Sequence, residues 1–151
     1  ILKTIKVRLL EYCQRTATKK VLVIIDSQVS SLYASKLDFQ SPYFICYYYV
    51  ICGSECSKSI DEVTKIWRFL LENSFSKDDL VLNVGGGTIC DIGGFVAATY
   101  KRGIPCINVP TTLLAMADAA YGGKNEINMG EFTPFEKCCR NNFNASRSVA
   151  R

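Results

Sequence analysis

Apolar residues are concentrated in four short runs along the chain, separated by polar or helix-compatible segments. The runs 21–25, 44–51 and 80–84 are rich in β-branched, aromatic and aliphatic residues, a composition typical of buried strands. Residues 106–109 form a fourth, shorter run. We therefore predict four strands, with helical segments over 29–37, 91–100 and 110–119.

The clearest helical signal begins at Ser59. Ser59 and Glu62 have the spacing of a capping box, and Asp61 is favourable near a helix N-terminus. Apolar residues then recur at spacings of three and four, which gives one apolar face made of Ile60, Val63, Ile66, Trp67, Leu70 and Leu71. We interpret Trp67 as a core residue of that face.

Strand and helix thus alternate with short connections until the pattern fails beyond residues 122–123. This alternation predicts an α/β fold with a mostly parallel sheet flanked by helices. We assign the domain to residues 1–132. Residues 133–151 are irregular and rich in Asn, Ser and Arg, so we expect a separate tail.

The composition excludes several classes of protein. Of the 151 residues, 48% are hydrophobic and 21% are charged, which excludes a disordered or fibrous chain. The longest apolar run, Tyr43–Cys52, has ten residues and is too short to cross a bilayer. The chain has no signal-peptide pattern and no initiator Met, so we expect a cytoplasmic protein and interpret the chain as a fragment or processed product.

The net charge of +4 does not predict nucleic-acid binding. Residues 133–151 carry four basic side chains and one acidic one, whereas the other 132 residues carry 14 basic and 13 acidic ones. The body is therefore near neutral, and it has no basic patch interleaved with stacking aromatics.

The chain has eight cysteines and no histidine. No two cysteines form a CxxC pair, so neither a zinc site nor a disulfide framework is predicted, and reduced thiols are the favoured interpretation. Without histidine, this chain alone completes no chemistry that needs an imidazole base or metal ligand.

The most informative junction is Gly85-Gly86-Gly87, directly after the run 80–84. Glycines at the end of a buried strand allow a sharp turn and let backbone N–H groups approach a phosphate at the start of the next helix. The third glycine of a dinucleotide fingerprint would fall at Cys90. A tight turn without a ligand explains the spacing equally well.

Two other strand ends carry groups suited to a ligand. Asp26 ends the first run, where a carboxylate suits ribose hydroxyls, although it could simply cap the next helix. Glu55 and Lys58 follow the second run, where a solvated charge pair is the alternative. Three such strand ends together favour a binding site.

A further group of polar residues follows in a stretch broken by Gly and Pro: Arg102, Thr111, Thr112, Asp118 and Lys124. Arg and Lys suit the phosphate or carboxylate of an anionic substrate, and Asp suits its hydroxyls. Thr111 and Thr112 after Pro110 could instead cap a helix. The residues alone predict a nucleotide-binding α/β domain with a polyanionic co-substrate.

Three blocks of sequence closely resemble the 3-dehydroquinate synthase family. They read VGGGTICDIGGFVAATYKRGIP at 84–105, VPTTLLA at 109–115 and DAAYGGK at 118–124. GSECSK at 53–58 is similar to the family's GGExxK element. The resemblance runs from about residue 20 to about residue 128 and implies most of a Rossmann-like NAD-binding domain, without the family's C-terminal helical domain.

The resemblance also implies a role for individual residues. Asp26, Glu55 and Lys58 would bind the adenosine ribose region of NAD. The pyrophosphate and the nicotinamide ribose would contact the glycine turn and its neighbours, namely Gly85, Gly86, Gly87, Asp91, Thr111, Thr112 and Leu114. Arg102 and Lys124 resemble contacts to the substrate phosphate and carboxylate, and Asp118 a contact near the reacting carbinol. Whether Asn125 or Asn128 is the family's substrate-contacting asparagine stays open.

The family's enzymes are carbon–oxygen lyases, often homodimers, that act on a phosphorylated sugar acid. They convert 3-deoxy-D-arabino-heptulosonate 7-phosphate to 3-dehydroquinate and phosphate in the shikimate pathway, with NAD and zinc or another divalent metal. The metal ligands, a glutamate and two histidines of the C-terminal domain, are absent from this chain, so we expect the isolated chain to be inactive. The alternatives are another sugar phosphate cyclase, a non-catalytic NAD-binding or interaction module, or a gene fragment without function.

Overall fold

A computed structural model describes residues 2–33, 36–119, 125–128 and 137–138. Four strands form one parallel sheet in the order β2-β1-β3-β4. Their bounds are Lys20–Asp26 (β1), Ile45–Ile51 (β2), Leu80–Gly85 (β3) and Cys106–Pro110 (β4). The four predicted strands and the α/β, Rossmann-like fold are therefore confirmed.

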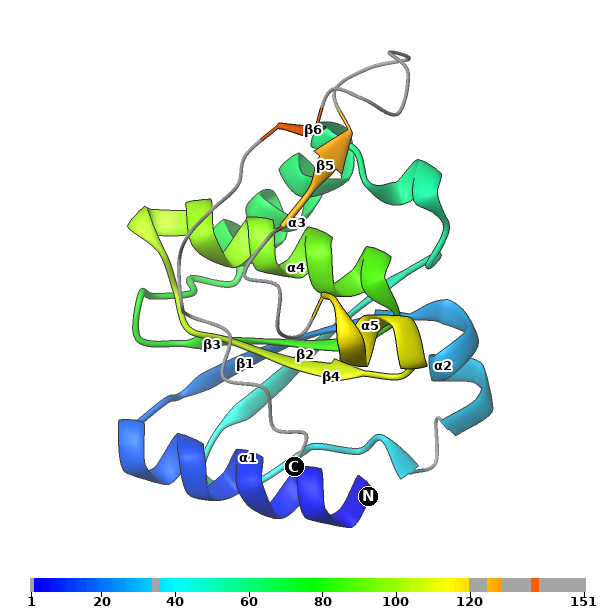
Figure 1. The fold of residues 1–151 in the computed structure, drawn as a ribbon. Helices are drawn as coiled ribbons and strands as arrows, with labels where there is room; N and C mark the ends of the chain where they lie inside the picture. Colours follow the sequence, from blue (N-terminus) through cyan, green and yellow to red (C-terminus); the bar gives the residue numbers. More distant parts are fainter. Residues whose placement is uncertain (1, 34–35, 120–124, 129–136, 139–151) are drawn as a thin grey trace.

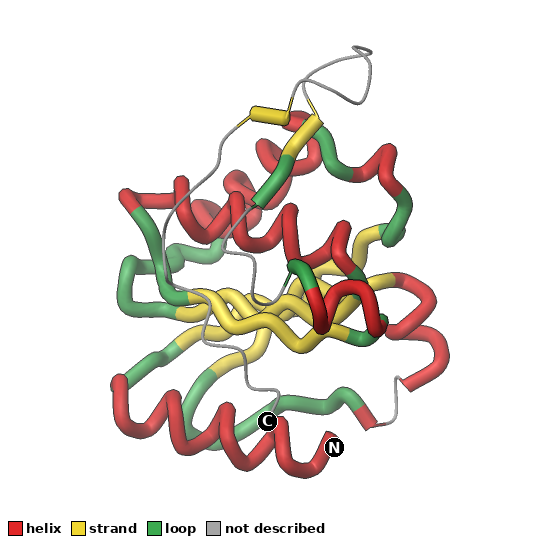
Figure 2. The backbone as a smooth tube through the Cα atoms, in the orientation of Figure 1, coloured by secondary structure: helices red, strands yellow, loops and turns green. Residues whose placement is uncertain are grey.

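Helices cover both faces of the sheet (Figure 1). Helix α1 (Leu2–Thr16) packs on one face, and α3 (Ile60–Glu72) and α4 (Gly87–Thr99) pack on the other. The shorter helices α2 (Ser27–Tyr33) and α5 (Leu113–Ala117) lie at the end of the sheet where the strands finish (Figure 2). Two 3-10 turns complete the connections, η2 (Glu55–Ser57) and η3 (Tyr100–Arg102).

Helix α1 was not among the predicted elements. Its first turn holds no acidic residue, and its buried side chains, Ile5, Leu9 and Cys13, form a single stripe at a spacing of four. Such a narrow stripe gives a weak periodic signal, because most positions of the helix face solvent. The spacing of four is nevertheless the feature that could have revealed it.

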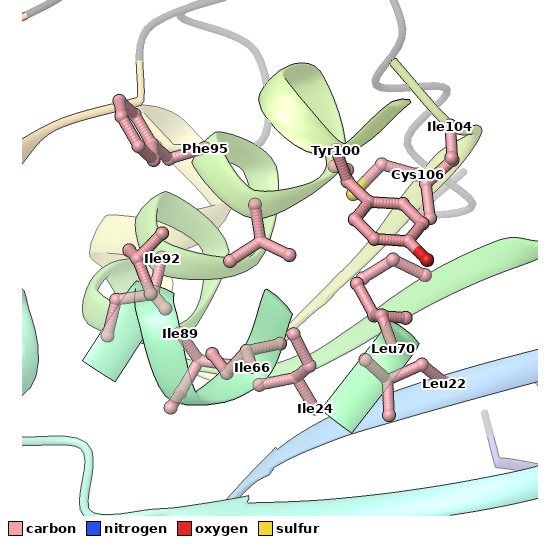
Figure 3. Packing of buried hydrophobic residues seen from close by; sticks show 14 of the residues in the cluster. Leu22, Ile24, Ile66, Leu70, Ile89, Ile92, Phe95, Tyr100, Ile104 and Cys106 are labelled. Carbon is pink, nitrogen blue, oxygen red and sulfur yellow. The ribbon is translucent and has the colours of Figure 1, made fainter. Parts of the chain in front are cut away.

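The two faces of the sheet bury separate apolar clusters, because alternate residues of each strand point to opposite sides. On the α3–α4 side, Leu22 and Ile24 of β1 lie beneath Ile66 and Leu70 of α3 (Figure 3). Helix α4 adds Ile89, Ile92 and Phe95 to this cluster, and every residue from Ile89 to Ala97 is buried. A helix that is buried nearly all round is held by packing rather than by an amphipathic face.

Two asparagines fill the space beside two glycines in the middle of α4. A Cβ atom on Gly93 would overlap the amide of Asn83, and one on Gly94 would overlap the amide of Asn125. Asn83 lies on β3, is fully buried, and donates to Oδ1 of Asn108 on β4 at 2.8 Å. The glycines therefore let α4 approach the sheet on one side and the segment 125–128 on another.

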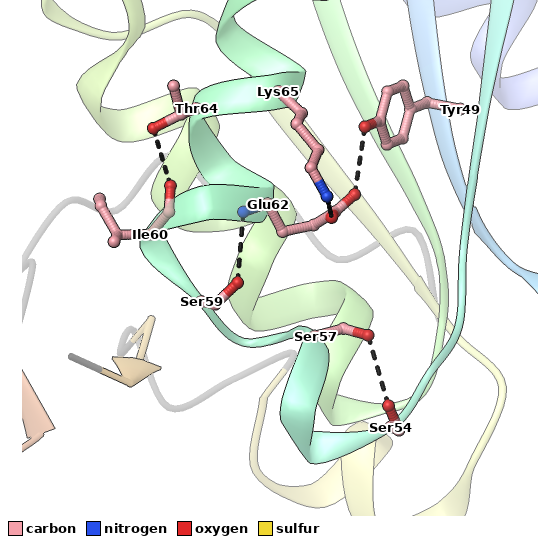
Figure 4. Close-up of polar contacts among 8 residues, drawn as sticks. All are labelled: Tyr49, Ser54, Ser57, Ser59, Ile60, Glu62, Thr64 and Lys65. Carbon is pink, nitrogen blue, oxygen red and sulfur yellow. Dashed lines mark hydrogen bonds and ion pairs between the residues drawn. The ribbon is translucent and has the colours of Figure 1, made fainter. Parts of the chain in front are cut away.

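The N-terminus of α3 is capped by one half of the predicted box. Ser59 Oγ accepts from the backbone N–H of Glu62 at 3.2 Å, which confirms Ser59 as the N-cap (Figure 4). The Glu62 carboxylate does not return to Ser59. It accepts from the Tyr49 hydroxyl at 3.1 Å and pairs with Lys65 at 3.0 Å. Burial, together with this carboxylate, raises the pKa of Tyr49 to about 12.

The last predicted helix begins later than expected. Pro110 ends β4 rather than starting a helix, and Thr112 is the N-cap of α5, where its hydroxyl accepts from Ala115 N–H at 3.2 Å. Two short strands follow, β5 (Ile127–Asn128) and β6 (Lys137–Cys138), which pair in antiparallel fashion. The boundary at residue 132 stays a prediction.

Six of the eight cysteines are described with their side chains, and all six are free thiols. Cys13, Cys46, Cys90 and Cys106 are buried, and burial raises the pKa of each to about 12. Cys52 and Cys56 are exposed in the loop that follows β2. None of the helices within the described ranges has the length and apolar content needed to cross a membrane.

Candidate functional site

A pocket of about 270 Å³ lies at the carboxyl end of the sheet, where β3 runs into α4. It is lined by residues from the loop after β2, from α4, from α5 and its end, and from the segment before β5: Lys58, Gly87, Asp91, Leu114, Ala115, Asp118, Ala119 and Glu126. Open α/β sheets bind ligands at this edge.

The start of α4 forms one wall of the pocket and is open. Gly86 is the N-cap and provides no side-chain hydrogen bond to the first turn. A Cβ atom on Gly87 would meet nothing within 4 Å, whereas one on Gly86 would lie 3.4 Å from Cγ2 of Thr112, and one on Gly85 would overlap Ile89. The N–H groups at Gly86 and Gly87 can therefore receive an anion, and the helix adds its positive end.

Lys58 and Asp91 form a shielded ion pair beside this turn. Lys58 Nζ lies 2.8 Å from Asp91 Oδ2 and 3.4 Å from Glu55 Oε2. The Lys58 and Asp91 side chains are only 12% and 13% exposed, while that of Glu55 is 68% exposed. Residues predicted from two separate segments, 53–58 and the one after the glycine turn, thus meet in one place.

The surroundings raise the pKa values of both Lys58 and Asp91. Burial alone would lower the pKa of Lys58, but the hydrogen bond and charge of Asp91, with Glu55, outweigh it. Burial raises the pKa of Asp91; Lys58 offsets part of this, and Glu126 and Glu55 add to it. Lys58 therefore stays charged at neutral pH and supplies positive charge to a pocket whose other charged lining groups are carboxylates.

Asp26 meets the same loop at its beginning. One carboxylate oxygen, Oδ1, accepts from Gln28 N–H at 2.7 Å at the start of α2, so the capping role is present. The other, Oδ2, occupies the space where a Cβ atom of Gly53 would lie. Asp26 is only partly buried, so its carboxylate can cap α2 and still face a ligand.

Thr111, Thr112 and Leu114 lie across the turn from α4. Thr111 N–H donates to Gly85 O at 2.9 Å, and Thr112 approaches Gly86. Leu114 is exposed on α5 at the pocket, and Asp118 is the C-cap of that helix. The structure thus places Thr111 and Thr112 at the glycine turn, and Leu114 and Asp118 at the pocket, and their roles toward a ligand stay predictions.

Arg102 and Lys124 do not join this group within the described residues. Arg102 lies in η3, beyond the C-terminal end of α4, and a helix of 13 residues places it about 20 Å from the start of α4. The contact of Arg102 to substrate stays a prediction, because within one chain Arg102 lies away from the pocket. Lys124 lies outside the described residues.

One pocket residue, Glu126, was missed by sequence reasoning. It lines the pocket beside Asp91 and contributes to the raised pKa of that carboxyl. No motif marks it, because it reaches the site through the return of residues 125–128 toward the loop after β2.

The described residues contain no group of three or more Cys, Asp and Glu side chains placed to hold a metal ion. Histidine is absent from the whole sequence. We therefore assign no metal site to the part of the chain that the structure describes.

Comparison with known proteins agrees with this geometry. The sequence model described as "3-dehydroquinate synthase N-terminal" matches residues 48–137, which include the loop after β2, the glycine turn and α5. The chain belongs to the 3-dehydroquinate synthase family. The match begins later and ends later than the resemblance at about 20–128.

Similar family members come from several bacteria. A 3-dehydroquinate synthase of Tropheryma whipplei (strain TW08/27) is 40% identical over 119 residues, covering 77% of this chain and 30% of that protein. One of Streptococcus pyogenes serotype M3 is 41% identical over 124 residues, covering 82% and 34%. The chain therefore spans about a third of the length of these relatives.

Solved structures show the same fold. A 2-deoxy-scyllo-inosose synthase superposes with a TM-score of 0.76 at 23% identity, over 88% of this chain and 38% of that one. The 2-epi-5-epi-valiolone synthase of Streptomyces hygroscopicus subsp. jinggangensis 5008, solved with NAD⁺ and Zn²⁺, has a TM-score of 0.73 at 27% identity, over 87% and 37%.

Proposed function

We propose that this chain binds NAD⁺ and supplies the cofactor side of 3-dehydroquinate synthesis. The observation that carries the proposal is the uncapped and unobstructed start of α4 beside Lys58. The pyrophosphate would lie against the N–H groups of Gly86 and Gly87, with Lys58 close enough to balance its charge. Asp26 and Glu55, which meet the same loop, would receive the hydroxyls of the adenosine ribose.

The remaining predicted residues would face the reacting end. Leu114 and Asp91 line the pocket and Thr111 and Thr112 lie at the glycine turn, and these four residues would hold the nicotinamide ribose region. Asp118 would contact the carbinol of a phosphorylated sugar acid, with Lys124 and Arg102 as contacts for its anionic groups. NAD⁺ supplies hydride acceptance from a ring alcohol, which acidifies the neighbouring C–H so that phosphate can leave.

The family resemblance and the relatives named 3-dehydroquinate synthase favour the heptulosonate phosphate as substrate. A cyclase that closes a different ring is the second candidate, supported by the 27% identity to the valiolone synthase. Both candidates share the cofactor site, so the first experiment addresses that site.

Titration of the 151-residue chain with NAD⁺, followed by NMR or calorimetry, tests the proposal. We expect a dissociation constant of about 1 mM, equivalent to ~4 kcal/mol, because the groups around the glycine turn are present. Gly87→Val should abolish binding without unfolding the chain, since a side chain there enters open space in the pocket.

Two lysines provide a matched comparison. Lys58 pairs with Asp91 at 2.8 Å and with Glu55 at 3.4 Å, and Lys65 pairs with Glu62 at 3.0 Å, but only Lys58 lines the pocket. Lys58→Gln should weaken binding at least fivefold, and Lys65→Gln should leave it unchanged. A folded chain that gives no response to NAD⁺, or equal losses in the two lysine variants, would overturn the proposal.

A further inference from the structure

Residues 125–128 return to the pocket and run beside the loop that carries Glu55 and Lys58. Ile127 is buried in the core and anchors this short segment. Asn128 forms a parallel bridge with Ser59, and its backbone N–H donates to Lys58 O at 2.7 Å. The main chain of Asn128 therefore fixes the position of Lys58 from outside the loop.

The side chain of Asn128 faces Glu55. Its Nδ2 atom lies 3.4 Å from Glu55 Oε1 and 3.5 Å from Glu55 O. The other carboxylate oxygen, Oε2, lies 3.4 Å from Lys58 Nζ. The two oxygens of Glu55 are thus held from two sides, although the side chain is 68% exposed and would otherwise rotate freely.

The charges around this contact explain why an amide suits the position. Glu55 and Asp91 both pair with one ammonium group, that of Lys58, and Glu126 adds a third negative charge beside Asp91. A neutral donor can orient Glu55 without adding a fourth carboxylate, and without competing with Asp91 and Glu55 for Lys58 as a further carboxylate would.

We propose that Asn128 is a positioning residue of the cofactor site. It orients the Glu55 carboxylate and holds the loop that places Lys58 against Asp91, so that both are in place before NAD⁺ arrives. The inference rests on the proposed function, because Glu55 and Lys58 are assigned to the cofactor there. It also gives Asn128 a role distinct from substrate contact.

Asn128→Asp tests this with an isosteric change that keeps the backbone contacts. In the 151-residue chain at pH 8, we expect the affinity for NAD⁺ to fall about tenfold, because the new carboxylate repels Glu55. A tenfold loss of affinity corresponds to ~1.4 kcal/mol of binding free energy. The loss should shrink between pH 8 and pH 5, as the introduced carboxyl takes up a proton. Asn128→Ala should lose affinity less, and equally at both pH values.

The second arm uses Glu55→Gln as the partner. In that background, Asn128→Asp should cost less than twofold, because the amide introduced at position 55 can donate to the new carboxylate. The same four proteins compared by urea unfolding need no cofactor, and the destabilisation by Asn128→Asp should again be relieved by Glu55→Gln.

These readouts separate the two proposals. If the unsubstituted chain does not bind NAD⁺ while the unfolding measurements still couple positions 55 and 128, the proposed function fails and the positioning contact stands. If the chain binds NAD⁺ but the Asn128→Asp variant binds it as tightly, the role of Asn128 is wrong. The role is also wrong if the variant's loss of affinity is the same at pH 8 and pH 5 and is not relieved by Glu55→Gln.

Discussion

Two pairs of glycines, at the start and in the middle of helix α4, serve opposite purposes. Gly86 is the N-cap, and Gly87 lines the pocket and has nothing within 4 Å of the place where a side chain would begin. Gly93 and Gly94, in its middle, have that space filled by the amides of Asn83 and Asn125. One pair leaves room for a ligand, and the other leaves room for the protein itself.

The comparison shows that glycine content alone does not locate a ligand. Both pairs read as Gly-Gly beside helix-compatible residues, and only the neighbouring chain decides which is open. At the start of α4 the neighbour is the edge of the sheet, where side chains diverge. In its middle the neighbours are β3 and the returning segment 125–128, which lie close to the helix axis.

The largest expected effect on stability comes from Gly93, one of the two glycines in the middle of α4 whose Cβ position is filled by an amide. Gly93→Ala should destabilise the chain by about 3 kcal/mol, because Asn83 is fully buried, is bonded to Asn108 and cannot move aside. Chemical unfolding measures this, with Gly87→Ala as the matched control at the open pair. Gly87→Ala should change stability by less than about 1 kcal/mol; similar losses in the two variants would contradict the comparison.

A smaller effect is expected at Gly94. Asn125 is only half-buried, so Gly94→Ala should cost about 1 kcal/mol as the amide is displaced. In an Asn125→Ala background the same change should become stabilising, since alanine is the better helix former by about 1 kcal/mol. If Gly94→Ala has the same sign in both backgrounds, Asn125 is not the group that requires the glycine.

Substitution of Asp91, one turn after the start of α4, should have the smallest effect on stability, and this effect depends on pH. Burial raises its pKa, so the folded chain binds this proton more tightly than the unfolded chain does. Folding is therefore favoured by this group as the pH falls. Relative to Asp91→Asn, the unsubstituted chain should gain stability between pH 7 and pH 4 in urea unfolding. A difference that stays constant, or that shifts toward the variant, would show that the Lys58 pair outweighs burial.

Much of the fold was predictable because its signals are local. The continuous apolar runs 21–25 and 80–84 mark strands that are buried on both faces, and Ser59 marks a helix start with its own hydroxyl. Helix α1 was missed because its single buried stripe resembles scattered apolar residues. Pro110 was assigned to a helix because proline suits a first turn as well as the end of a strand.

The location of the site, at the edge where the strands end, was predictable from the sequence, but the contacts between its side chains were not. Parallel strands end at one edge, so Asp26, Lys58 and the glycine turn had to be neighbours. The pairing of Lys58 with Asp91, and the approach of Asn128 and Glu126, depend on residues far apart in sequence. The buried amide pair of Asn83 and Asn108 was also unpredictable, because two polar residues within strands argue against burial until their register is known.

The strand order also determines when each strand can find its partners while the chain is being synthesised. β1 pairs with β2 across 25 residues but with β3 across 59, since Val21 lies beside Leu80. Closing the longer loop costs about 0.8 kcal/mol more in chain entropy, and β3 leaves the ribosome seconds after β2 at ~5–20 residues per second. During that interval the most apolar segment of the chain, 21–25, has one bare edge. The central position that buries β1 in the finished sheet therefore also leaves it open to premature association for some seconds during synthesis.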